Sequence, residues 1–160
     1  MYMTYRIVFI FILTTIISLK AQEEKIIEIR QAGGSKQDQE AFPGANILFK
    51  NLDKRVILFH DGALIESDLA YFYAKENFFK ATGDVVFTQG DSLRMTCNKI
   101  EYNGDTKITL AQGDVFLKRP DMSLKTEKLN IDRVKNEAFY NSKGVAVSYT
   151  HLTLPTILLV

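Results

Sequence analysis

Two histidines, one cysteine and two aspartates are the residues that could carry chemistry in this sequence. His60 and His151 lie far apart, and neither belongs to a cluster with metal-ligand spacing, so no metal site is indicated. Cys97 could act as a nucleophile only with a histidine partner, which nothing in the sequence supplies. Asp84 and Asp114 each follow a glycine, and we expect their carboxylates to face water at bulges rather than to form an acid–base pair. There is no phosphate-binding loop, nucleophile elbow or zinc-protease motif. The sequence therefore predicts neither an enzyme nor a cofactor or metal centre.

The composition suits a single domain with a substantial core. The chain has 160 residues, of which 46% are hydrophobic, and a formal net charge of +1. No basic surface for a nucleic acid is implied by this charge. With one cysteine, the chain has no disulfide framework.

The elements that must position any site come from a repeat. Gly83, Gly113 and Gly144 follow one another at intervals of about 30 residues, a period typical of stacked supersecondary units. Turn signals such as Asp61-Gly62 and Asn103-Gly104 separate segments rich in β-branched and aromatic residues, which favours tight hairpins. The sequence thus predicts an all-β fold of long antiparallel strands, two in each repeat.

Small residues are predicted to form one row across neighbouring strands. In a hairpin, the positions of facing residues sum to about twice the turn centre, and this relation aligns Ser67, Gly83, Cys97, Gly113, Thr126 and Gly144. Along this row the alternation of apolar residues slips by one, which keeps one face apolar only if each strand carries a bulge there. We therefore expect the sheet to fold over along this row, which we call the crease.

A sheet folded in this way encloses an apolar trough. The predicted lining residues are Phe72, Phe78, Val85, Phe87, Leu93, Met95, Ile100, Tyr102, Ile108, Leu110, Val115, Leu117, Leu129, Ile131 and Phe139. Phe79, Val86 and Phe116 fall on the opposite parity, where earlier strands or a neighbouring domain would have to cover them. The alternative is a closed, dry core, which would suit an envelope scaffold or a glycan-binding module using outward aromatics such as Tyr71 and Tyr73.

The two ends of the chain differ from the repeats. Residues 1–21 are typical of a cleavable secretory signal, with an uncleaved anchor as the alternative. Residues 22–44 are expected to form an N-terminal strand and a polar linker, and residues 45–147 the repeat domain. We interpret residues 148–160, which lack charge and a fourth repeat, as a non-native tail introduced by sequence assembly; a genuine apolar strand is the alternative.

The repeats resemble the OstA-like domain. The resemblance covers roughly residues 45–147 and rests on the segments Ser67 to Tyr73 (SDLAYFY), Cys97 to Gly104 (CNKIEYNG) and Gly113 to Leu117 (GDVFL). The third copy departs from the motif at Glu127 and Ile131. The resemblance implies a V-shaped β-jellyroll, shared by LptA-type bridges and the N-terminal part of LptD-type translocons. It implies that this domain stacks end to end with related β-jellyroll domains of inner-membrane-anchored and outer-membrane transport components. It further implies a periplasmic location, free or associated with the outer membrane, and lipopolysaccharide as the ligand that passes along the interior.

Overall fold

The computed structural model describes residues 25–140 and 144–148, which form one 12-stranded antiparallel sheet. The strands are β1 Glu28–Gln31, β2 Gly34–Gln37, β3 Asn46–Phe49, β4 Val56–His60, β5 Ala63–Ser67, β6 Leu69–Tyr73, β7 Phe78–Gln89, β8 Leu93–Asn103, β9 Ile108–Lys118, β10 Met122–Asp132, β11 Glu137–Phe139 and β12 Val145–Ser148. The predicted signal segment and nearly all of the predicted tail lie outside the described residues. Within the described ranges, no helix has the length and apolar character needed to cross a membrane.

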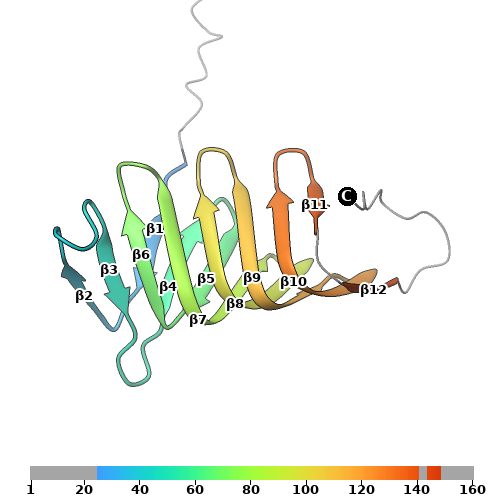
Figure 1. Ribbon diagram of the computed structural model, residues 1–160, viewed down its shortest axis with the longest axis horizontal. Coiled ribbons are helices and arrows are strands. Elements are labelled where there is room, and N and C mark those ends of the chain that lie inside the picture. Colours follow the sequence, from blue (N-terminus) through green and yellow to red (C-terminus); the bar gives the residue numbers. More distant parts are fainter. Residues whose placement is uncertain (1–24, 141–143, 149–160) are drawn as a thin grey trace, which may run out of the picture.

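The sheet is folded into two walls that share their long strands. β7 pairs with β6 through residues 78–82 and with β5 through residues 86–89, so its halves belong to different walls. The first wall contains β2, β3, β6, β11 and the half-strands 78–82, 99–103, 108–112 and 128–132; the second wall contains β1, β4, β5, β12 and the half-strands 85–89, 93–97, 115–118 and 122–126. Figure 1 shows the resulting V, with β6 in front of the fainter β4 and β5. The predicted all-β, folded antiparallel architecture is confirmed.

The crease runs through the predicted small residues, but facing positions are offset by one or two. Cys97 faces Val85, where the hairpin relation predicts Gly83. Gly83 has a φ of +82°, and a Cβ at this position would lie 2.7 Å from the Asp68 Cβ. Gly113 adopts the same conformation one repeat later, with a φ of +77°. The bend therefore requires glycine at these two positions, for both its backbone freedom and its lack of a side chain.

The alternation of inward and outward side chains shifts by one residue at the crease in β8 but not in β9. The sequence predicts the shift in both strands. In β8 the inward residues on either side of the crease, Cys97 and Ile100, are three positions apart, so the alternation slips as predicted. In β9 the Gly113-Asp114 pair has φ values of 77° and 47°. This pair adds one residue to the bend, so the inward residues Ala111 and Val115 are four positions apart and the alternation is kept.

This difference corrects three predicted lining residues. Phe78, Ile108 and Leu110 face outward from the first wall, and Ile108 is 40% exposed. Phe79 and Thr109 point inward in their place, each 0% exposed. The prediction fails in β7 and β9 because the extra residue of each Gly-Asp bulge restores the parity that the bend alone would change.

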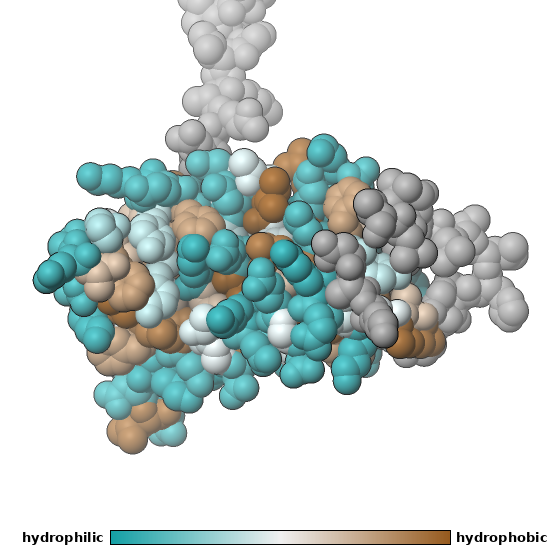
Figure 2. All heavy atoms as spheres, in the orientation of Figure 1, coloured by the Kyte–Doolittle hydropathy of each residue, from teal (hydrophilic) through white to brown (hydrophobic). Residues whose placement is uncertain are grey.

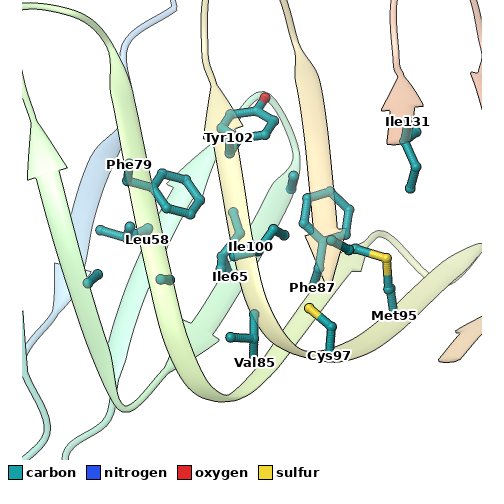
Figure 3. Packing of buried hydrophobic residues seen from close by; sticks show 14 of the residues in the cluster. Leu58, Ile65, Phe79, Val85, Phe87, Met95, Cys97, Ile100, Tyr102 and Ile131 are labelled. Carbon is teal, nitrogen blue, oxygen red and sulfur yellow. The ribbon is translucent and has the colours of Figure 1, made fainter. Parts of the chain in front are cut away.

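The interior between the walls is tightly packed over most of its length. Phe79, Phe87 and Tyr102 point into it from β7 and β8 (Figure 3), and each is at most 1% exposed. Burial of one such aromatic side chain contributes about 1.5 to 3 kcal/mol. Apolar packing between the walls is therefore the main force that keeps the V folded.

One predicted loop is a strand. The sequence predicts a polar linker before the repeats, but Gly34–Gln37 forms β2 and pairs with β3. Its side chains are polar and mostly exposed, so the strand is held by backbone hydrogen bonds at the sheet edge and leaves no apolar pattern to detect.

Candidate functional site

An open cavity lies at the C-terminal end of the stack, where β11 and β12 lie apart from each other (Figure 1). Its volume is about 500 Å³, within the range of about 300 to 1,000 Å³ that is typical of ligand pockets. Both walls contribute to its apolar lining, which consists of Leu93, Leu117, Met122, Leu124, Ile131, Ala138, Phe139 and Tyr140.

The cavity exists because two short, separate strands pair with β10 in place of one long strand. β11 covers only Asn130–Asp132 of β10, and β12 covers only Met122–Lys125. Among the residues that the structure describes, the end of the trough therefore lacks the inward side chains that fill it elsewhere. Leu93, Met122 and Ala138 are only partly buried there, although each packs against the core.

Polar groups border this apolar cavity. They belong to Gln89, Arg119, Arg133, Asn136 and Glu137. Guanidinium groups bind carboxylates and phosphates through paired hydrogen bonds, so the site suits an amphiphile with an apolar body and an anionic group. Among the described residues, no cluster of histidine, cysteine or acidic side chains could hold a metal ion.

The predicted lining residues divide into three groups. Four of them reach the cavity: Leu93, Leu117, Ile131 and Phe139. Eight lie in the packed interior: Phe72, Val85, Phe87, Met95, Ile100, Tyr102, Val115 and Leu129. The other three face outward, as described above. The structure thus places most of the predicted set between the walls, but as a filled core that opens at one end.

Sequence reasoning misses several cavity residues. Met122 has the same parity as Leu124 within β10, and this alternation was a usable signal for both. Ala138 and Tyr140 lie in the part of the third repeat where the motif weakens. Arg133 lies in a polar turn, where an apolar periodicity gives no information.

Figure 2 shows that the outer surface of the first wall is mostly hydrophilic, with hydrophobic residues scattered among the polar ones. On the second wall, Phe116 of β9 is 42% exposed, so its predicted outward parity is confirmed. The large apolar surfaces of the sheet are therefore mainly those that the two walls turn toward each other.

At the edge opposite the crease, which we call the mouth, turns of the two walls meet and close the trough. Lys107 Nζ in the β8–β9 turn lies 2.5 Å from Asp61 Oδ2 in the β4–β5 turn, and Lys25 also pairs with Asp61. Hydrogen bonds from Lys107 and Lys25 hold the pKa of the Asp61 carboxyl well below its ordinary value of 3.8. His60 Nδ1 lies 2.7 Å from the Tyr102 hydroxyl, and burial raises the pKa of that hydroxyl. His60 is a strand-end residue, as predicted.

Asp61→Asn is expected to reduce the amount of folding stability that the protein loses when the solution is acidified. The folded protein keeps Asp61 ionised, while the unfolded chain binds a proton as the pH falls through 3.8. The stability contributed by this carboxylate is therefore present above that pH and lost below it. Urea unfolding at neutral pH and near pH 3 should show that the wild type loses more stability than the variant. Asp53→Asn, in an exposed turn, is the matched control; an equal acid response in all three proteins would contradict the assignment.

Cys97 has a packing role at the crease. Its side chain is buried, and burial raises the pKa of its thiol to about 11. The group is therefore a thiol at neutral pH, whereas nucleophilic cysteines are thiolates. Asp84 and Asp114 are exposed on the outer side of the crease, as predicted for bulge residues.

Comparisons with known proteins agree with this geometry. The model of a family described as OstA-like protein matches residues 24–154. The fold is similar to the crystal structure of LptH from Pseudomonas aeruginosa, described as the LptA homologous periplasmic component of the conserved lipopolysaccharide transport device. That similarity has a TM-score of 0.63 at 11% sequence identity and covers 77% of this chain and 87% of LptH. No curated protein matches the sequence.

Proposed function

The chain belongs to the OstA-like protein family, and from this premise we propose that it carries lipopolysaccharide by sheltering the acyl chains between the two walls of its sheet. The family acts in transport and is not enzymatic. The related fold of LptH, a periplasmic component of a lipopolysaccharide transport device, supports the same cargo and the same compartment.

The observation that carries the proposal is the cavity at the C-terminal end. It combines an apolar lining with Arg119 and Arg133 at its border. Burial of hydrocarbon yields about 0.8 kcal/mol per methylene, so a chain of about 12 carbons gains at most about 10 kcal/mol. Ion pairs at an exposed border add about 0 to 1 kcal/mol each. Burial therefore dominates, and its lack of directionality allows the cargo to move along the trough.

Related domains at the two ends of the stack would extend the trough. β1 and β2 are the edge strands at one end of the stack, and β11 and β12 are the edge strands at the other. Val145 and Val147 of β12 are 68% and 45% exposed. Exposed edge strands pair readily with a further strand. End-to-end stacking on related β-jellyrolls would therefore cover β12 and bring the cavity up to the interior of the next domain.

An alternative function has some support in the outer surface. Phe42 and Tyr71 lie with ring centroids 4.6 Å apart on the outer face of the first wall, and the packed interior also suits a scaffold with a dry core. A glycan-binding module would lose affinity for oligosaccharide with Tyr71→Ala and would bind no lipid through the cavity.

Filling the cavity tests the proposed function. Ala138 lines the cavity and is partly buried, so Ala138→Phe occupies space without removing an apolar side chain. We expect binding of purified lipopolysaccharide to weaken about tenfold or more, which corresponds to about 1.4 kcal/mol. The control is Lys125→Phe, because Lys125 is exposed on the outer face of the second wall. Thermal unfolding is measured for both variants. Unchanged binding by the Ala138 variant would contradict the proposal.

A further inference from the structure

The mouth is closed by a group of polar side chains that we call the latch: Asp61, Gln89, Tyr102, Lys107 and Arg133. Lys107 Nζ donates to Asp61 Oδ2 at 2.5 Å and so joins a turn of the first wall to a turn of the second. Arg133, in the β10–β11 turn, donates to the Tyr102 hydroxyl at 2.8 Å, to Gln89 Oε1 at 3.1 Å and to the Asp61 carbonyl oxygen at 3.0 Å. A single guanidinium group thus ties the first wall to two places on the second.

The latch contains residues of both the cavity and the packed interior. Gln89 and Arg133 line the cavity. Tyr102, which accepts a hydrogen bond from Arg133, is 0% exposed and belongs to the interior. An acyl chain that moves from the cavity toward Tyr102 on the mouth side therefore passes the latch.

The interior beside the latch carries an unsatisfied polar group. Thr109 is 0% exposed, and its hydroxyl has no hydrogen-bond partner among the described residues. Its neighbours on the adjoining strands are Tyr102 and Ile131. A buried hydroxyl without a partner is unfavourable, so a permanently dry core would favour an apolar residue of the same shape. The Thr109 hydroxyl would therefore gain hydrogen bonds when the walls separate and water reaches it.

The latch contact between Lys107 and Asp61 lies near solvent, whereas His60 and Tyr102 make a buried contact between the walls beneath it. The side chains of Lys107 and Asp61 are 34% and 19% exposed, so water can solvate both groups when the ion pair opens. The apolar contacts beneath them are non-directional, so contacts with hydrocarbon can replace them. Separation of the walls at the mouth therefore requires no break in the sheet.

We propose that the latch controls how far an acyl chain enters the trough from the cavity. With Lys107 and Arg133 bound to the second wall, the chain stays in the cavity; with both released, the walls separate and the chain lies along the interior. This inference rests on the proposed function, because it describes the regulation of the same trough.

The test compares a locked and an unlatched form of the full chain. The locked form carries Asp61→Cys and Lys107→Cys, joined by a short bis-maleimide, in a Cys97→Ser background that leaves no other cysteine. The unlatched form carries Lys107→Gln and Arg133→Gln. The probe is stearic acid with a nitroxide near its methyl end, which broadens the NMR signals of nearby methyl groups labelled on isoleucine. Ile131 reports on the cavity, and Ile65, at 0% exposure, reports on the interior.

We expect both forms to lose the Ile131 signal, whereas only the unlatched form loses the Ile65 signal. Loss of the Ile65 signal in both forms, or in neither, would overturn the latch as the controlling element. Retention of the Ile131 signal in both forms would instead overturn the cavity as the lipid site, and with it the proposed function. If the unlatched form does not fold, the double-cysteine protein with Arg133→Lys and without the bis-maleimide replaces it, because that protein lacks both the Lys107–Asp61 ion pair and the guanidinium group that bonds to Gln89, Tyr102 and Asp61.

Discussion

Gly113→Val is expected to lower the free energy of unfolding by about 2 to 5 kcal/mol. A side chain at a left-handed φ costs about 1 to 2 kcal/mol, and overpacking adds about 1 to 3 kcal/mol. Both costs arise at Gly113, whose φ is +77° and where a Cβ would lie 3.0 Å from the Asn98 Cβ as well as 2.8 Å from Asn98 Nδ2. Urea unfolding of the purified protein measures the loss.

Gly62→Val is the matched control for the crease. Gly62 has the same φ of +77°, but a Cβ there would have no neighbour within 4 Å in the described part of the chain. The free energy of unfolding of the Gly62→Val variant should therefore fall only by the conformational cost of about 1 to 2 kcal/mol. Equal losses for the two variants would mean that the close approach at the crease does not contribute to the fold.

Phe79→Ala is expected to lower the free energy of unfolding by about 3 to 5 kcal/mol, the range for removing a buried aromatic ring and leaving a cavity. Phe79 is 0% exposed and lies between the walls, with its ring centroid 5.5 Å from that of Tyr102. Thermal or urea unfolding measures the loss. The neighbouring Phe78 is the control, because it faces outward and contacts Tyr73 at a centroid distance of 5.8 Å.

Phe78→Ala should cost less than about 1 kcal/mol, because a substitution at a partly exposed position removes few buried contacts. The two variants together determine which of two adjacent phenylalanines points into the trough. If Phe78→Ala lowers the free energy of unfolding more than Phe79→Ala does, Phe78 is the buried residue, as expected from the sequence. That result would contradict the arrangement of β7.

The turns and the repeat were predictable because each follows from local chemistry. Asp61 and Gly62 have φ values of 48° and 77°, as a tight hairpin requires and as the Asp-Gly sequence predicts. The row of small residues could likewise be located from the period of the glycines. These features depend on residues close together in the chain or at a fixed spacing.

The inward face of β7 and β9 was not predictable in the same way. Phe78 and Phe79 are identical in type, and only the extra residue of the Gly83-Asp84 bulge decides which of them is buried. In β9 the larger residue Ile108 faces outward while Thr109 is buried, so hydrophobicity alone gives the wrong answer. Parity beyond a bulge depends on how many residues the bend uses, which is a property of the paired strands.

The cavity and the latch depend on contacts between distant parts of the chain. Arg133 contacts Asp61 across a separation of 72 residues, and no periodicity or motif connects the two positions. The division of the final strand into β11 and β12, which opens the cavity, also results from pairing to different halves of β10. The sequence could therefore predict an apolar trough, but not where it is open.

Site-specific photo-crosslinking determines which face of the second wall contacts lipopolysaccharide. Leu117 and Phe116 are neighbours in β9 that face opposite sides of the second wall: Leu117 lines the cavity at 4% exposure, and Phe116 is 42% exposed on the outside. With a benzophenone amino acid at each position in turn, we expect the Leu117 protein to crosslink to lipopolysaccharide and the Phe116 protein to give only background. Crosslinking from position 116 and not from position 117 would contradict a lipid site between the walls.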